Sequence, residues 1–96
     1  MSDTQADEEP VVVSLVLDLL KPHEPDLATF ARGVAQAPGV TTVVATRAAT
    51  DREVETVEVA VEGTDLDLDA VEAQVVDLGG SVHSVDEVVC RDRDTP

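Results

Sequence analysis

The residues with the most chemical potential in this chain are its two histidines and the carboxylates near them. His23 lies in the segment KPHEPD beside Glu24, and His83 lies in SVHSVDEVV shortly before Asp86. An imidazole together with carboxylates is a donor set suited to a divalent metal ion. The same groups could serve as a general acid and base. Either chemistry requires a fold that brings the two segments together.

Other catalytic and binding motifs are absent or incomplete. The serines have no GxSxG context, and the five glycines form no phosphate-binding loop. Phe30 is the only aromatic residue, so a base-stacking sheet is excluded. Asp65, Asp67 and Asp69 imitate the start of an EF-hand loop, but the sequence lacks its glycine and its final glutamate. We interpret these acids as helix caps and solvating groups.

Cys90 is the only cysteine, which excludes an internal disulfide and a paired-thiolate metal site. We expect it to be a small buried residue near a strand end. A fold without disulfides is typical of a reducing cytoplasm.

The charge balance excludes the commonest mode of nucleic-acid binding. The chain has 21 acidic against 6 basic residues, for a formal net charge of -15. Such a surface repels phosphates and anionic membranes, so neither is an expected partner. Lys21 is the only lysine, and the acids are spread along the whole chain. This composition indicates adaptation to a high-salt cytoplasm, where self-repulsion is screened.

Six elements must position the histidines. Apolar runs rich in valine predict strands, and apolar residues at i, i+3, i+4 and i+7 predict helices. Pro22 ends the first strand, Asp26 can cap the first helix, and Gly79 with Gly80 closes the second helix. The predicted strands cover 11–20, 40–50, 53–63 and 81–90, and the helices follow Asp26 and begin near Asp67.

This order predicts an α+β, ferredoxin-like βαββαβ sandwich: a four-stranded antiparallel sheet with two helices on one face and a spatial strand order of 4-1-3-2. We expect the domain to cover residues 10–90, between a disordered acidic tail at 1–9 and a C-terminal tail at 91–96. No apolar run is long enough to cross a membrane, and the acidic N-terminus is unlike a secretory signal.

Two consequences of this fold bear on function. Helices on one face leave the other face bare, with Val12, Val16 and Leu20 on the first strand, which predicts a homo-oligomer. The end of the first strand also lies beside the start of the fourth. That neighbourhood would collect Asp18, Lys21, His23 and Glu24 with Gly80, His83 and Asp86.

The segments LVLDLLKPHEPDL, VEGTDLDLDAVEAQVVDLGG and LGGSVHSVDEVV resemble the archaeal domain of unknown function 211 family, from about Val12 to Cys90. The resemblance implies a ferredoxin-like fold and homo-oligomers, with bound metal ions in some members and no assigned reaction. It carries a polar signature onto Asp18, Lys21, His23, Glu24, His83, Ser84, Asp86 and Glu87. The candidate metal ligands are therefore Asp18, His23, Glu24, His83, Asp86 and Glu87.

Three hypotheses follow. The first is a non-enzymatic oligomeric module that binds a divalent metal ion or small ligand at the His23/His83 end. The second is a small enzyme with a site between subunits, in which either histidine is the acid or base and Asp18 or Glu24 orients it. The third is a purely structural assembly subunit. The first is favoured, with the structural subunit as its main alternative.

Overall fold

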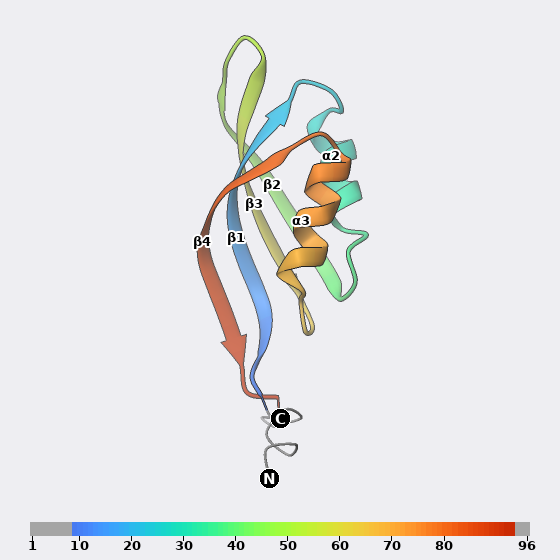
Figure 1. The fold of residues 1–96 in the computed structure, drawn as a ribbon, viewed down its shortest axis with the longest axis vertical. Coiled ribbons are helices and arrows are strands. Elements are labelled where there is room, and N and C mark those ends of the chain that lie inside the picture. Colours follow the sequence, from blue (N-terminus) through green and yellow to red (C-terminus); the bar gives the residue numbers. More distant parts are fainter. Residues whose placement is uncertain (1–8, 94–96) are drawn as a thin grey trace.

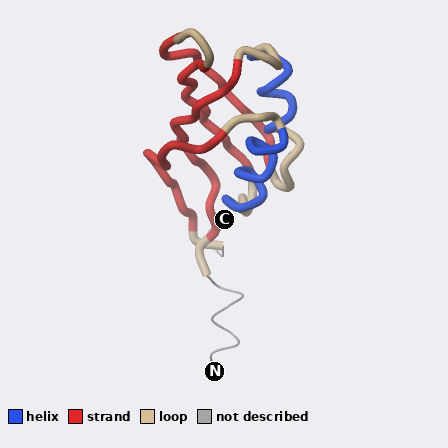
Figure 2. The backbone as a smooth tube through the Cα atoms, turned by 45° about the horizontal axis from the view of Figure 1, so that its top comes forward, coloured by secondary structure: helices blue, strands red, loops and turns tan. Residues whose placement is uncertain are grey.

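Four strands and two helices follow one another in the predicted order. The computed structural model describes residues 9–93, and the elements are β1 (Val11–Pro22), α2 (Leu27–Val34), β2 (Val40–Thr50), β3 (Val54–Gly63), α3 (Leu68–Asp77) and β4 (Ser81–Arg91). The sheet order is β2-β3-β1-β4, and every neighbouring pair is antiparallel. Both helices cover one face of this sheet (Figures 1 and 2). The predicted ferredoxin-like α+β fold is confirmed.

The helices begin and end where local chemistry dictates. The side chain of Asp26 accepts a hydrogen bond from the backbone N–H of Thr29 at 3.0 Å, which caps α2. Asp67 caps α3 in the same way, by accepting from Asp69 N–H at 3.0 Å. Gly79 ends α3 with a φ of +90°, a conformation that glycine adopts without steric cost. The aspartates that imitate an EF-hand therefore include the helix cap.

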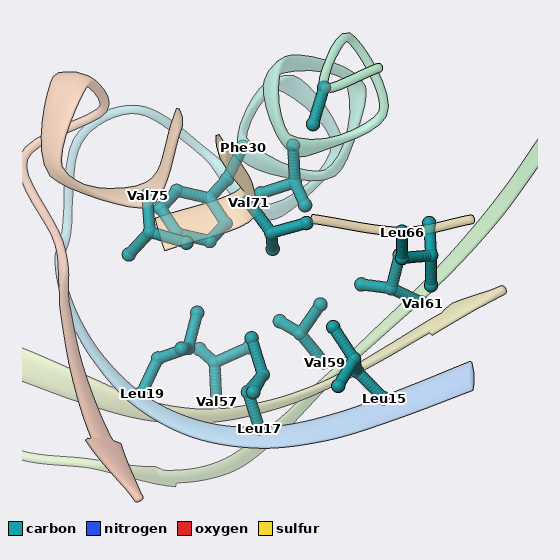
Figure 3. Close-up of a cluster of buried hydrophobic side chains, with 12 residues drawn as sticks. Leu15, Leu17, Leu19, Phe30, Val57, Val59, Val61, Leu66, Val71 and Val75 are labelled. Carbon is teal, nitrogen blue, oxygen red and sulfur yellow. The ribbon is translucent and has the colours of Figure 1, made fainter. Parts of the chain in front are cut away.

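The core lies between the sheet and the helices and is almost wholly aliphatic (Figure 3). β1 and β3 alternate, so that every second side chain points at the helices. Each fully buried leucine or valine stabilises the fold by about 1.5–3 kcal/mol. The buried apolar residues are Leu15, Leu17, Leu19, Phe30, Val34, Ala37, Val57, Val59, Val61, Leu66, Val71 and Val75.

One predicted face is wrong at the start of β1. Val13 has no partner in the β1–β4 register, which shifts between Val12 and Ser14. This bulge shifts the alternation of inward and outward side chains by one residue. Val12 therefore packs against the core and is not part of the bare face. Val16 and Leu20 keep the predicted register, in which the buried Leu15, Leu17 and Leu19 alternate with them.

The predicted bounds of the domain, residues 10–90, stay a prediction. β4 includes Arg91, one residue beyond the predicted limit. The predicted acidic tail, apart from Glu9, and residues 94–96 of the C-terminal tail lie outside the described residues. Neither described helix has the length and apolar character needed to span a bilayer.

Candidate functional site: a buried charge cluster at the end of β1

The inward faces of β1 and β3 both end in a charged residue. Lys21 continues the series of buried leucines on β1, and Glu55 continues the series of buried valines on β3. The two residues are direct partners in the antiparallel register. Both side chains are buried, and Lys21 is fully so. Two opposite charges thus replace the apolar pair that the pattern would otherwise place there.

Every proton of the Lys21 ammonium has an acceptor. Nζ donates to the backbone carbonyl of Pro22 at 2.9 Å, to that of His23 at 3.5 Å and to Glu55 Oε1 at 3.3 Å. An ammonium has three protons, so this buried charge is fully hydrogen-bonded. The Phe30 ring adds a long cation–π contact, with its centroid 5.9 Å from Nζ. These partners offset the cost of removing the charge from water.

His23 joins the bend after β1 to the turn between β2 and β3. Its Nδ1 lies 3.1 Å from Glu55 Oε2, and its Nε2 lies 3.1 Å from the carbonyl oxygen of Asp51 and 2.9 Å from that of Arg52. Carbonyl and carboxylate oxygens only accept hydrogen bonds. Both ring nitrogens must therefore donate, and the geometry selects the imidazolium form.

The electrostatics agree with this protonation state. The hydrogen bond to Glu55, followed by that to the Arg52 carbonyl, raises the pKa of His23 above 6.5. The same hydrogen bond from His23 lowers the pKa of Glu55, and Lys21 and Arg47 lower it further. Arg47 Nη1 lies 3.8 Å from Glu55 Oε2. We refer to Lys21, His23, Arg47 and Glu55 as the charge cluster.

The structure brings the predicted segments together but does not gather the predicted ligands. Leu20 pairs with Ser81, and Gly79 lies against Pro22, so the bend and the start of β4 are neighbours as expected. The His23 ring, however, is engaged by β3 and by the turn that precedes it. His83 is exposed on β4, and its side chain makes no hydrogen bond or ion pair within residues 9–93.

The remaining candidates are dispersed. Asp18 is half-buried on β1, opposite Glu58 on one side and Ser84 on the other. Asp86 accepts a 2.8 Å hydrogen bond from Ser84 Oγ. Glu87 is exposed on β4 and Glu24 is exposed in the bend. Among residues 9–93, no three His, Cys, Asp or Glu side chains are close enough to hold a metal ion, and metal binding stays a prediction.

Sequence reasoning missed Glu55 and Arg47. Val57, Val59 and Val61 alternate with polar or small residues, and extending this alternation by one step places Glu55 on the inward face. The same step on β1 places Lys21 there. A charged residue at an inward position on each of two paired strands was the available signal. The same step applies to Arg47, which follows Val43 and Ala45 on the inward face of β2 and pairs with the buried Val57.

The opposite end of the sheet is open. A cavity of about 450 Å³ lies there, lined by Val13, Ser14, Thr41, Glu62, Gly63, Val89 and Arg91. It is far along β1 from the predicted ligand site. The expectation that Cys90 is buried is wrong, because its side chain is exposed on β4 at this end. β4 is an edge strand, and α3 does not extend over its last residues (Figure 1).

Comparison with known proteins assigns the family. The model of the DUF211 family, described as uncharacterised ArCR, matches residues 13–93. The uncharacterised protein MJ0319 of Methanocaldococcus jannaschii is 41% identical over 75 residues, which cover 78% of this chain and 77% of that protein. The match spans all six elements, including both segments that carry the histidines. The chain belongs to the DUF211 family.

Proposed function

We propose that the chain is the subunit of a homo-oligomer that assembles through the edge of its sheet that β4 forms. The observation that carries this proposal is the row of valines on β4. Val85, Val88 and Val89 remain 40%, 49% and 40% exposed. Apolar residues gathered in this way on one exposed strand are typical of an interaction surface. Leu20 on the neighbouring strand β1 is exposed as well.

The state of the His23 ring makes this residue a poor acid or base for the enzyme hypothesis. A general base needs a free ring nitrogen, and both nitrogens of His23 face oxygen acceptors. The charge cluster therefore acts as a clamp that fixes the bend after β1 to the β2–β3 turn. The clamp keeps the sheet rigid while the β4 edge assembles.

Binding of a divalent metal ion remains part of the proposal, as a property of the assembly. A single copy gathers no suitable trio of side chains within residues 9–93, so the ligands would come from more than one copy. His83, Asp86 and Glu87 are the best donors, because all three are exposed on β4. Calorimetric titration of a divalent ion should give a signal that His83→Ala abolishes and His23→Ala retains. A purely structural subunit would give no signal in any of these proteins.

We further propose that the assembly works in a salt-rich cytoplasm. The net charge of -15 supports this, and so does the position of Lys21. The only lysine is fully buried, so no lysine side chain remains on the surface. The unfolding midpoint should rise as KCl increases to molar concentration, because the repulsion between surface carboxylates becomes screened. A midpoint independent of KCl would contradict this habitat.

Light scattering in molar KCl tests the assembly directly. The expected mass is a multiple of the 10.1 kDa subunit at micromolar concentration. A mass of one subunit under these conditions would remove the proposal. An extrinsic dye or refractive index should serve as the concentration signal, because the chain has neither tryptophan nor tyrosine.

A further inference from the structure

The cavity at the open end of the sheet lies on the face that the helices leave uncovered (Figure 2). Its lining residues come from all four strands. Ser14 alternates with the buried Leu15, and Glu62 alternates with the buried Val61, so both side chains point away from the helices. The volume of about 450 Å³ is within the range of ligand pockets in proteins, roughly 300–1,000 Å³. The cavity is therefore large enough for a small metabolite.

Two bulges explain why the sheet is hollowed at this end. Val13 is an extra residue in the register of β1 against β4, and Thr41 is an extra residue in the register of β2 against β3. A bulge bends its strand and redirects nearby side chains, and bulges are common beside active sites. Both of these residues line the cavity. The shape of the cavity thus follows from the pairing of the strands.

One acidic and one basic side chain line the cavity, and they are not paired with each other. Glu62 lies on β3 and Arg91 lies on β4, with β1 between them, so their backbones are about 10 Å apart across the sheet. Neither side chain makes an ion pair within residues 9–93. A carboxylate and a guanidinium can each bind a ligand group of opposite charge. This arrangement favours a ligand that carries both charges.

A ligand with a single charge fits the cavity poorly. Glu62 repels an anion that binds at Arg91, and the net charge of -15 opposes anions further. Arg91 repels a cation that binds at Glu62. A zwitterion meets an opposite charge at both positions, so neither repulsion applies to it as a whole.

Two hydroxyl groups and two valines complete the lining that such a ligand would contact. Ser14 is the direct partner of Glu62 on one side and of Val89 on the other, so it lies in the middle of the row. Its side chain makes no hydrogen bond within residues 9–93. The Thr41 hydroxyl donates to the carbonyl oxygen of Glu62 at 3.1 Å, and its oxygen can still accept a hydrogen bond. Val13 and Val89 add apolar surface.

We propose that this cavity binds a zwitterionic α-amino acid with an aliphatic side chain. Arg91 binds the carboxylate, Glu62 binds the ammonium group, and the aliphatic side chain packs against Val13 and Val89. The site lies at the opposite end of β1 from the charge cluster, and it does not depend on the proposed assembly.

Calorimetric titration with L-leucine in molar KCl tests the proposal. L-leucine should give a saturable heat. 4-Methylpentanoate lacks the ammonium group and 3-methylbutylamine lacks the carboxylate, and each should bind about tenfold more weakly because one charged contact is lost. The absence of saturable heat up to about 10 mM L-leucine would overturn the proposal. An analogue with one charge that binds as tightly as L-leucine would overturn it as well.

Substitutions test the two charged contacts separately. Arg91→Gln and Glu62→Gln should each weaken L-leucine binding by about tenfold. The matched controls are Arg93→Gln and Glu58→Gln, because neither residue lines the cavity. All four residues are exposed, so the fold should tolerate the changes. A control that weakens binding as much as the cavity variants would show a general charge effect and reject the site.

Two further measurements locate the ligand and separate this site from assembly. L-leucine should shift the amide NMR signals of Ser14, Thr41 and Gly63 and leave those of His23 and Glu55 unchanged. Shifts confined to the charge cluster would overturn the proposal. Light scattering on the titrated samples reports assembly independently. A monomer that binds L-leucine would remove the proposed assembly and retain the site, whereas an oligomer that gives no heat would do the reverse.

Discussion

The two ends of β1 differ in whether the side chains around them find partners within the chain. At the Pro22 end, Lys21 and Glu55 are buried and their hydrogen bonds are all made within the chain. At the Val11 end, β1 lies beside the last residues of β4, where Val88 and Val89 are exposed and Arg91 has no ion pair within residues 9–93. The first end completes the subunit by itself, and the second requires another molecule. Stability and assembly should therefore respond to different substitutions.

The largest expected effect is on stability, at the closed end. Glu55→Gln should lower the unfolding midpoint by roughly 15 °C, because the buried Lys21 ammonium loses its carboxylate. Thermal unfolding in molar KCl measures this. The double variant Lys21→Met, Glu55→Leu should recover most of the loss, since an apolar pair leaves no charge uncompensated. A single variant as stable as the parent would show that the charge cluster contributes nothing.

At the open end the main effect should be on assembly. Val89→Lys should raise the dissociation constant about a hundredfold, because it places a charge among the exposed apolar residues of β4 that the proposed assembly would bury. Val44→Lys on the other edge strand is the control and should leave assembly unchanged. Light scattering across a dilution series measures both. Neither variant should change the unfolding midpoint of the monomer, and equal weakening by both would place the interface elsewhere.

A smaller effect is expected from pH, again at the closed end. The raised pKa of His23 means that its contribution is complete below about pH 6.5 and is lost as pH rises through the folded-state pKa. The lowered pKa of Glu55 means that its contribution is present above pH 4.5 and is lost as pH falls through its folded-state value. The charge cluster should thus stabilise the fold most between these two pH values. Outside them, the unfolding midpoint should fall by a few degrees.

The matched control for this pH dependence is His23→Gln, which cannot become charged. Its unfolding midpoint should lose the decline above pH 6.5 that the parent has and retain the decline at acid pH. Assembly should be the same in both proteins. A parent whose decline survives the substitution would mean that another group is responsible.

The smallest effect concerns the reactivity of Cys90. Cys90 is exposed on β4, and assembly through this edge would shield its thiol, so labelling should slow severalfold between dilute and concentrated protein. Val89→Lys should remove this dependence on concentration. A labelling rate that is the same at all concentrations of the parent would argue against shielding of this edge.

The regular parts of the molecule were predictable because apolar periodicity controls them. The alternation of valines on β3 and the stripe of α2 each place a face against the core, and these elements lie within a residue or two of their predicted bounds. Local chemistry also identified both N-caps. These features depend on residues close together in the sequence.

The site was harder to predict because it depends on pairing between strands. A bulge such as Val13 or His83 arises from the register of two strands. The sequence of either strand alone does not indicate it. The direction of the His23 ring depends on the β2–β3 turn, some thirty residues away, whose carbonyls it meets. The sequence therefore located the neighbourhood correctly and did not indicate which strand His23 would join.

The burial of Lys21 gives the folded subunit an unusual chemical surface. Because no other lysine exists, the native protein presents no side-chain amine to acylating reagents or to enzymes that modify lysine. Unfolding uncovers one such group. The rate of acylation at Lys21 therefore measures how often the chain unfolds.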